Sequence, residues 1–239
     1  MNYPGKELEN FDRATLWRKY IYIEIKKFIT GKVLEVGAGI GSFTKNYMHA
    51  VDQLTLSEID SNNYQIIKKK FTNAKINFTN KTISEIYERF NTIMYLNVLE
   101  HIKKDQEEIF DAFEKLEING YLIVLVPAHN RLYSKFDEAV GHHRRYEIDF
   151  FQKLKLKGGK LEKLIYLDAI GYFLYFLNKI FFKEEIYPSK FKIFLWDKIF
   201  TPITYFLDKL LLNKFGKNIL YVVKKLWAKA IINFSCCIK

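Results

Sequence analysis

The residues best suited to chemistry are three glycines at alternate positions, preceded by a carboxylate. Residues 33–44 read V-L-E-V-G-A-G-I-G-S-F-T, so an apolar strand runs into Gly37, Gly39 and Gly41, with Glu35 two residues before the first of them. Without Cβ atoms the backbone can turn sharply and approach a ligand, and a helix that follows presents free N–H groups to an anion. We therefore expect a nucleotide-cofactor loop formed by Glu35, Gly37, Ala38, Gly39 and Gly41.

A second carboxylate stands at the spacing expected for a ribose-binding residue. Glu58 ends the strand-like run Q-L-T-L-S-E and lies 21 residues after Gly37, near the roughly 20 expected for a ribose-binding acid. Asp60 is the alternative, and it could equally cap a helix that starts near Ser61. A dinucleotide loop would carry its third glycine where Ser42 stands, which disfavours an NAD-dependent oxidoreductase.

The glycine pattern resembles motif I of the Rossmann-like (class I) S-adenosylmethionine-dependent methyltransferases. The run N-V-L-E-H-I at 97–102 resembles the motif after the fourth strand of small-molecule members. The elements V-P-A, L-Y and D-x-x-x-G-H-x-R-R-Y within 126–146, and the strand at 215–225, are similar to a bacterial and archaeal subgroup. The resemblance covers nearly the whole chain to about residue 225. It implies an α/β fold with a mostly parallel seven-stranded sheet, an antiparallel last strand, and S-adenosyl-L-methionine as cofactor.

The elements that must position these residues alternate along the chain, as in a parallel sheet with right-handed crossovers. A helix over 9–29 is expected before strands at 32–36, 53–58, 75–79, 91–97 and 120–126, with helices near 42–50, 61–71 and 104–118. Such sheets bind ligands beyond the carboxyl ends of their strands. We therefore add to the predicted cofactor site the residues Ile59, Thr82, Ile83, Asn97 and Val98.

The alternation ends near residue 147. A helix at 147–156 and strands at 161–168 and 219–224 are expected, with an aromatic-rich stretch between the two strands. The apolar run 164–182 is interrupted by polar residues, so a strand followed by a buried helix explains it better than a transmembrane helix. We divide the chain into a cofactor-binding core with an N-terminal helix (1–168), a helical lid or insertion (169–214), the last core strand (215–225) and a tail (226–239).

The stretch 193–212 carries a stripe of apolar residues at helical spacing. Because such stripes usually pack on a core, we expect a lid packed in this way. Interfacial docking on a membrane is the alternative, since lysines and Trp196 lie nearby. The stripe consists of Phe194, Leu195, Ile199, Ile203, Phe206, Leu207 and Leu210.

Candidate catalytic residues follow the fourth strand. His101 is a candidate general base because its unperturbed pKa lies near 6.5. Glu100 could orient His101, contact the substrate or bind a metal; alternatively it caps a helix while His101 packs behind the cofactor. Two adjacent ligands are weak evidence for a metal, so we predict no metal site.

The loop 127–146 is rich in His, Arg and Asp, and loops on a rigid sheet edge often hold substrate residues. We predict His142 as an acid or base. Paired arginines offer planar donor forks to phosphate or carboxylate. The alternative is a salt-bridged loop in which Asp137 and Glu138 neutralise the two arginines. The residues predicted to contact substrate here are Tyr133, His143, Arg144 and Arg145.

The net charge of +11 lies in the second half of the chain: residues 121–239 hold 21 Lys and Arg against 10 Asp and Glu, whereas residues 1–120 hold 17 of each. This asymmetry indicates either a solvated basic face or an anionic partner, such as a phosphorylated substrate, a membrane surface or nucleic acid. Cys236 and Cys237 are adjacent, which leaves no disulfide framework, and the N-terminus lacks a signal pattern. We expect a cytoplasmic protein, with peripheral contact at the inner membrane face as an alternative.

Together the patterns predict methyl transfer to an oxygen or nitrogen of a small molecule, with an envelope glycan or lipid-linked sugar as the suggested acceptor. Nucleic acid is disfavoured, because enzymes that methylate base amino groups carry a proline where Val98 follows Asn97. Cytosine C5 chemistry needs a pocket cysteine as nucleophile, and neither cysteine is near the sheet edge. A nucleic-acid-binding methyltransferase and a cofactor-binding module without catalysis are the alternatives.

Overall fold

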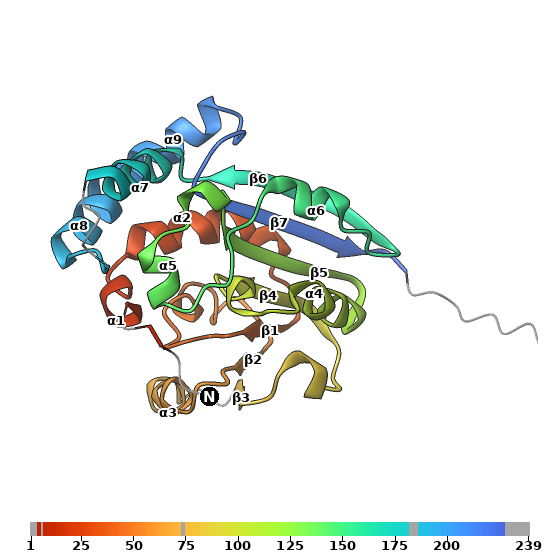
Figure 1. Cartoon of the computed structure of the whole chain (residues 1–239). Helices are drawn as coiled ribbons and strands as arrows, with labels where there is room; N and C mark the ends of the chain where they lie inside the picture. The colour runs from red at the N-terminus through yellow and green to blue at the C-terminus, as the bar shows by residue number, and fades with distance from the viewer. Residues whose placement is uncertain (1–3, 6, 73–74, 182–185, 228–239) are drawn as a thin grey trace, which may run out of the picture.

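The computed structural model describes residues 4–5, 7–72, 75–181 and 186–227 and builds them around a seven-stranded sheet (Figure 1). The strands lie in the order β3-β2-β1-β4-β5-β7-β6. The pairs within β1 to β5 are parallel, whereas β7 is antiparallel to both β5 and β6, which confirms the predicted fold class. The strand bounds are Lys32–Val36 (β1), Gln53–Ser57 (β2), Ile76–Thr79 (β3), Phe90–Leu96 (β4), Leu116–Pro127 (β5), Gly159–Leu167 (β6) and Asn218–Lys225 (β7).

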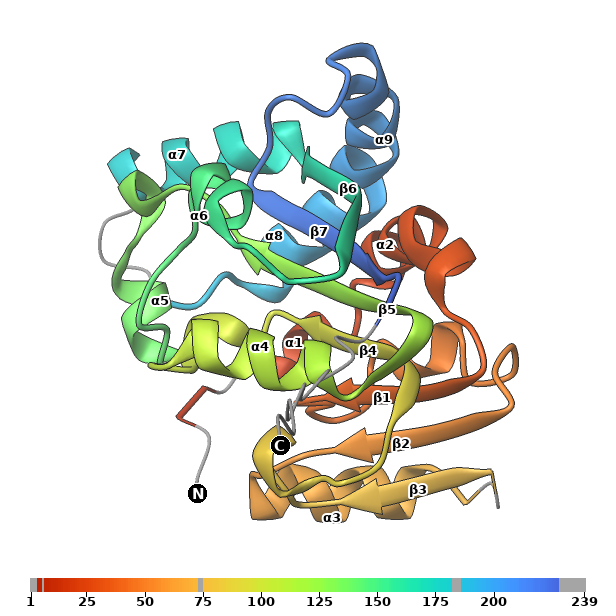
Figure 2. The same ribbon diagram turned by 90° about the vertical axis from the view of Figure 1, so that its right-hand side faces the viewer.

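Helices cover both faces of the sheet (Figures 1 and 2), because successive strand residues point to opposite faces. Val33 of β1 belongs to a buried cluster that includes residues of α2 and α3. The next residue, Leu34, belongs to a second cluster with residues of α4 and α6. The α-helices are α1 (Leu8–Phe11), α2 (Thr15–Ile25), α3 (Ser61–Lys70), α4 (Asp105–Glu114), α5 (Lys135–Ala139), α6 (Ile148–Lys153), α7 (Ala169–Phe181), α8 (Lys190–Leu195) and α9 (Thr201–Leu210).

Two predicted helices differ in their bounds from the observed ones. The helix expected over 9–29 is divided into α1 and α2. The helix expected to reach residue 118 ends at Glu114, because β5 begins at Leu116, four residues before the predicted strand. The alternative in which Asp60 caps α3 is confirmed, since its side chain accepts a hydrogen bond from the backbone N–H of Asn63 at 2.8 Å.

The segment after the glycine loop does not form the α-helix predicted near 42–50. It consists of turns with a 3₁₀ turn over Thr44–Asn46. The hydroxyl of Thr44 donates to Glu35 at 2.6 Å, and the side-chain amide of Asn46 donates to the carbonyl of Phe43 at 2.9 Å. Such side-chain bonds compete with helix formation. The expectation that a helix N-terminus presents N–H groups at this loop is therefore wrong.

The C-terminal helices attach to the core through buried aspartates. A π-helical turn, Trp196–Phe200, joins α8 to α9. Asp197 is 1% exposed and accepts hydrogen bonds from the backbone N–H groups of Leu16, at 3.3 Å, and Trp17, at 2.8 Å. These N–H groups belong to the first turn of α2, which the helix itself cannot satisfy. Asp197 therefore caps α2 from a distant part of the chain.

Asp208 makes the equivalent connection from α9. Its fully buried carboxylate accepts a hydrogen bond from the hydroxyl of Tyr20 at 2.6 Å. It also accepts the backbone N–H groups of Asp168, at 2.6 Å, and Ala169, at 2.9 Å, where α7 begins. Asp208 thus joins α9 to both α2 and α7.

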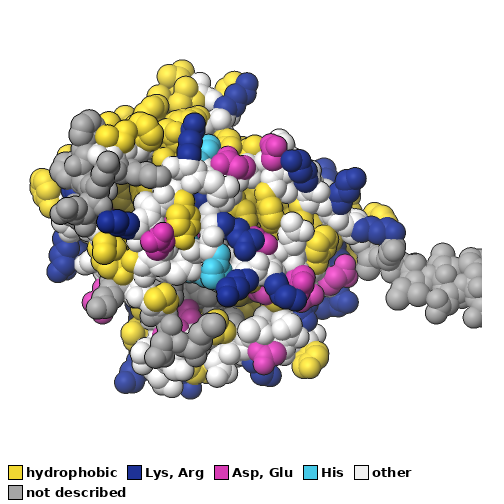
Figure 3. All heavy atoms as spheres, viewed as in Figure 1, with side chains coloured by type: hydrophobic (Ala, Val, Ile, Leu, Met, Phe, Trp, Pro, Cys, Tyr) yellow, Lys and Arg dark blue, Asp and Glu magenta, His cyan; other side chains and the backbone are white. Residues whose placement is uncertain are grey.

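The apolar stripe of α8 and α9 faces outward, because the buried aspartates decide which side of these helices faces the sheet. Phe194 is 54% exposed, Ile199 47%, Ile203 51%, Phe206 72% and Leu210 79%. The expectation that the stripe packs on the core is therefore wrong for these five residues. Figure 3 shows hydrophobic side chains gathered at the upper left, where Figure 1 places α7, α8 and α9. Within the described parts of the chain, no helix has both the length and the apolar character needed to cross a bilayer.

Replacing Asp208 by alanine is expected to lower the free energy of unfolding by about 1.5–3 kcal/mol, because hydrogen bonds to a charged group are lost and their buried donors stay unpaired. Urea denaturation measures the change. Asp149→Ala is the control, since the Asp149–Lys153 pair is exposed and worth less than about 1 kcal/mol. Equal effects of the two substitutions would contradict the assigned role of Asp208.

Candidate active site

The glycine loop lies at the carboxyl end of β1, and its glycines have different roles. Gly37 and Gly39 have φ angles of +65° and +56°, in the left-handed region that favours glycine. A Cβ at Gly37 would lie 2.7 Å from Cγ2 of Val98, so packing against the end of β4 requires glycine there. A Cβ at Gly39 would have as its nearest described neighbour the side chain of Leu8, at 3.6 Å. Gly39 therefore keeps space open on the outer side of the loop.

Glu58 connects the end of β2 to this loop. Its carboxylate accepts the backbone N–H of Gly39 at 2.7 Å with one oxygen and that of Asp60 at 2.8 Å with the other. Burial raises the pKa of Glu58, and the backbone hydrogen bonds oppose this shift. The carboxylate predicted to bind ribose hydroxyls therefore lies against the glycine loop.

Glu35 supports the loop from inside the protein. It is 3% exposed, and one carboxylate oxygen accepts hydrogen bonds from the hydroxyls of Thr44 and Tyr47. Burial raises the pKa of Glu35 to about 7, although both hydroxyls oppose the shift. These contacts explain why a carboxylate stands before the glycines: it ties the loop to the turns that follow.

The other predicted cofactor residues lie at the carboxyl ends of β1 to β4. Ala38 is buried, and its N–H donates to the carbonyl of Ser57 at 3.0 Å. Ile59 is 44% exposed beside Glu58. After β3, Thr82 is exposed and Ile83 is fully buried. After β4, Asn97 is exposed with a φ of +57°, and the adjacent Val98 is half-buried against Gly37.

A cleft of 390 Å³ lies beside the glycine loop. Its walls include Leu8 of α1, Ile40 of the loop, and Asp60 and Ile66 near α3. This volume falls in the lower part of the range of small-molecule sites. The glycine loop and the segment after β2 thus border the same cleft, through Ile40 and Asp60.

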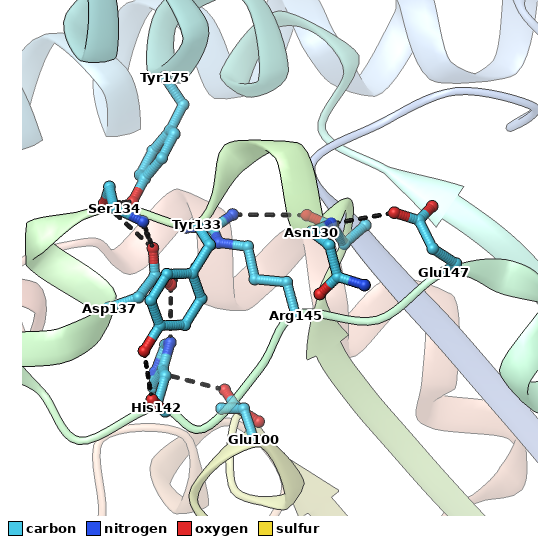
Figure 4. Close-up of polar contacts among 10 residues, drawn as sticks. Glu100, Asn130, Tyr133, Ser134, Asp137, His142, Arg145, Glu147 and Tyr175 are labelled. Carbon is cyan, nitrogen blue, oxygen red and sulfur yellow. Dashed lines mark hydrogen bonds and ion pairs between the residues drawn. The ribbon is translucent and has the colours of Figure 1, made fainter.

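Glu100, His101 and His142 come together beyond the end of β4. Glu100 and His101 belong to a 3₁₀ turn, Leu99–His101, and His142 comes from the loop after α5. One ligand atom from each of the three lies within 4.8 Å of the other two. The rings of His101 and His142 meet edge to face with centroids 4.7 Å apart. Figure 4 shows His142 beside Glu100, with Nε2 of His142 at 3.8 Å from Oε1 of Glu100.

The surroundings alter the charge states in this cluster. Glu100 is fully buried, and burial raises its pKa to about 7 against the opposing effect of His142. Burial, followed by the electrostatic effect of the neighbouring His142, lowers the pKa of His101 to about 4. His101 is therefore neutral near pH 7 and a weaker base than an ordinary histidine.

Asp137 is the centre of the polar network in the loop (Figure 4). Its buried carboxylate accepts hydrogen bonds from Nδ1 of His142 at 2.8 Å, Nε of Arg145 at 2.9 Å and the hydroxyl of Tyr175 at 3.0 Å. Burial alone would raise the pKa of Asp137, but the hydrogen bond from His142 and the charge of Arg145 outweigh it and lower this pKa to about 2. Asp137 therefore stays ionised and holds His142 and Arg145 in place.

The salt-bridged alternative for this loop is correct in part. Arg145 is 4% exposed and pairs with Asp137, whereas Arg144 pairs with Asp105 of α4 at 2.9 Å. The hydroxyl of Tyr133 donates to the carbonyl of His142 at 2.6 Å, and His143 is exposed. Tyr133 and His143 are therefore more accessible to a substrate than Arg145 is.

Sequence reasoning assigned Asp137 only to charge neutralisation and did not single out Asp105 or Tyr175. The sequence S-K-F-D is a capping pattern that could have indicated the structural role of Asp137. In the structure, the N–H of Ser134 donates to the carboxylate of Asp137 at 2.9 Å at the start of α5. Asp105 and Tyr175 carry no comparable local signal, since each reaches the loop from another helix.

Comparison with known proteins agrees with this geometry. The profile of the methyltransferase domain family matches residues 12–157. A methyltransferase solved in complex with the Haloferax volcanii Trm112 methyltransferase activator has a TM-score of 0.62 at 9% identity, covering 92% of this chain and 94% of that chain. The N-methyltransferase NodS of Bradyrhizobium japonicum, bound to S-adenosyl-L-homocysteine, has a TM-score of 0.58 at 11% identity, covering 94% and 93%. No curated protein sequence matches the chain.

A Rossmann-like sheet with an open glycine loop and an adjacent carboxylate defines the class of S-adenosylmethionine-dependent enzymes with this fold. The residues fit the cofactor, because Gly39 leaves space at the loop and Glu58 places a carboxylate acceptor against it. The chain belongs to the methyltransferase domain family and is a class I S-adenosylmethionine-dependent methyltransferase.

Proposed function

We propose that the protein transfers the methyl group of S-adenosylmethionine to an oxygen or nitrogen of a small molecule. The observation that carries this proposal is the convergence of three loops at one sheet edge. Gly37 packs against Val98, and the N–H of Gly39 donates a hydrogen bond to Glu58. The ring of His142 contacts His101 in the turn after β4. A cofactor on the glycine loop and an acceptor under the 127–146 loop would meet at the end of β4.

On this proposal the cofactor is held by the ends of four strands. Glu58 accepts the ribose hydroxyls, and Gly39 lets the cofactor approach the backbone. Gly41 supports this loop from inside, because a Cβ there would collide with the side chain of Phe71. Glu35 acts indirectly, because it is buried and one of its carboxylate oxygens accepts hydrogen bonds from Thr44 and Tyr47. The remaining predicted contacts are Gly37, Ala38, Ile59, Thr82, Ile83, Asn97 and Val98.

The acceptor is assigned to the polar residues beyond β4. Glu100, His101 and His142 face its reacting atom, while Tyr133 and His143 contact the rest of it; Arg144 and Arg145 hold the loop through Asp105 and Asp137. Alignment of two bound reactants can supply on the order of 7–11 kcal/mol, so positioning accounts for most of the expected rate. The acceptor's lone pair forms the new bond as the methyl–sulfur electrons return to sulfur.

The acceptor class we favour is a lipid-linked sugar or envelope glycan, approached from an anionic membrane surface. The support is the exposed apolar side chains of α7 and α9 together with the basic character of the second half of the chain. Amphipathic helices with lysines beside an apolar face bind membrane interfaces in this way. A soluble acceptor needs no such surface.

Methyl-labelled cofactor provides the direct test. The enzyme is incubated with S-adenosylmethionine labelled in its methyl group and with separate bacterial extracts of envelope lipids, soluble metabolites and nucleic acids. We expect label in the lipid-linked fraction. Transfer confined to nucleic acid, or absent from every fraction while S-adenosylhomocysteine still binds, would contradict the proposed acceptor class.

Membrane docking is tested by flotation with anionic vesicles. Phe206→Ser combined with Leu210→Ser is expected to weaken vesicle binding about 10- to 100-fold, because each buried apolar side chain contributes about 1.5–3 kcal/mol at most. Tyr87→Ser is the matched control, since Tyr87 is 90% exposed on the chain between β3 and β4. Recovery of the unmodified protein in the soluble fraction would remove the membrane proposal.

A further inference from the structure

The carboxylate of Glu100 lacks the contacts that a buried charge requires. Its side chain is fully buried, and neither oxygen accepts a hydrogen bond from the described residues. Nε2 of His142 lies 3.8 Å from Oε1 of Glu100, which is beyond hydrogen-bond distance. A buried polar group without a partner is costly, so such groups usually indicate a missing ligand, water or ion.

His142 is oriented toward the same space. Asp137 accepts a hydrogen bond from Nδ1 of His142 at 2.8 Å. Because an ionised carboxylate only accepts hydrogen bonds, the proton of the neutral ring lies on Nδ1 and the lone pair of Nε2 points toward Glu100. A carboxylate behind the far nitrogen of a histidine is the usual support of a metal-binding imidazole.

His101 completes the group. Its ring meets that of His142 edge to face, and the ligand atoms of the three residues all lie within 4.8 Å of one another. Ligands about 2.0–2.1 Å from a tetrahedral ion stand roughly 3.4 Å apart. Side-chain movements of about 1 Å would therefore bring the three atoms to coordination distance.

We propose that Glu100, His101 and His142 bind a divalent transition-metal ion, with Zn²⁺ as the best match. Two imidazoles and one carboxylate are a donor set that such ions prefer, whereas Mg²⁺ and Ca²⁺ favour oxygen ligands. Three protein ligands leave a fourth position open, as catalytic rather than structural zinc sites do. The ion satisfies the carboxylate of Glu100, which accepts no hydrogen bond from the described part of the chain.

The role of this ion rests on the proposed function, although its binding does not. The cluster lies next to Asn97 and Val98, beside the expected position of the methyl group. An acceptor hydroxyl in the open position would lose its proton to water more readily, because a metal ion lowers the pKa of a coordinated oxygen. The oxygen then forms the bond to the methyl carbon, and the electrons of the broken carbon–sulfur bond return to sulfur.

The test uses the full chain, stripped of metal with a chelator. Co²⁺ binding is followed by visible absorption and Zn²⁺ binding by calorimetry. We expect one ion per chain, and affinity at least about 100-fold weaker in Glu100→Gln and in His142→Ala, because each removes one of three ligands. His49→Ala is the control, since His49 is an exposed histidine remote in sequence from the cluster.

Binding of S-adenosylhomocysteine to the same variants separates this proposal from the proposed function. Retained cofactor binding also shows that a variant is folded, and the isosteric Glu100→Gln preserves the shape of the site. No saturable Co²⁺ or Zn²⁺ binding by the unmodified protein would overturn the metal site. Equal binding by the unmodified protein and both variants, or binding lost only in His49→Ala, would identify surface attachment and overturn it as well.

Discussion

Replacing Asp137 by alanine is expected to lower the free energy of unfolding by about 3–5 kcal/mol. The substitution leaves the guanidinium of Arg145 buried without its charged partner, and removal of one member of a buried ion pair costs more than the pair itself contributes. It also removes the acceptor for His142 and Tyr175. Urea denaturation, with the slope of the transition compared between variants, measures the loss.

Glu138→Ala is the matched control, because Glu138 is the next residue of α5 and is exposed. A surface substitution of this kind changes stability by less than about 0.5 kcal/mol. Similar losses in both variants would show that Asp137 stabilises only the helix, and the network centred on it would not be the explanation.

The same carboxylate predicts a pH dependence of stability. The pKa of Asp137 is lowered from 3.8 to about 2 in the folded protein, so the unfolded chain binds its proton first as the pH falls. This contribution to stability is fully present above about pH 4 and is lost as the pH falls through 2. Unfolding free energies measured at pH 5 and pH 3 should therefore differ less in Asp137→Asn than in the unmodified protein.

The second large effect is expected at the cofactor loop. Gly39→Arg should weaken S-adenosylhomocysteine binding by more than about 100-fold, or roughly 2.7 kcal/mol, because the side chain enters the space that the cofactor approaches. The fold should tolerate it, since the nearest described neighbour of a Cβ is Leu8 at 3.6 Å and the left-handed backbone costs only about 1–2 kcal/mol. Calorimetric titration and thermal unfolding measure the two quantities.

Two further variants make this result specific. Ala50→Arg adds the same side chain at an exposed position of the following segment, and cofactor binding should be unchanged. Gly37→Val should destabilise the fold itself, because a Cβ there would meet Val98 at 2.7 Å. Undiminished binding by Gly39→Arg would show that the cofactor does not use this loop.

Most charged residues of the loop 127–146 bind other parts of the protein. Asp137 fixes both His142, next to the proposed acceptor position, and Arg145, within the protein interior. The motif D-x-x-x-G-H-x-R-R-Y therefore mainly builds the loop, and fewer of its residues are open to a substrate than the charge pattern indicated. Tyr146 also holds the loop in place, since its buried hydroxyl donates a hydrogen bond to Asp105 at 2.8 Å.

The sequence by itself determined the features that depend on neighbours along the chain. Apolar runs predicted all seven strands, and the glycine spacing predicted the left-handed loop that Glu58 contacts, because strand periodicity and left-handed turns are local properties. The predicted helix over 42–50 is wrong, because the hydrogen bond from the hydroxyl of Thr44 to Glu35 competes with helix formation there.

Only the tertiary structure decided which distant side chains meet. It placed His142 against Glu100 across 42 positions of sequence and paired Arg144 with Asp105. It also turned the apolar stripe of α9 outward, because Asp208 accepts the N–H groups of Asp168 and Ala169, where α7 begins. Periodicity reports that a helix has two different faces, but the face that is buried depends on which partners satisfy the polar groups between elements.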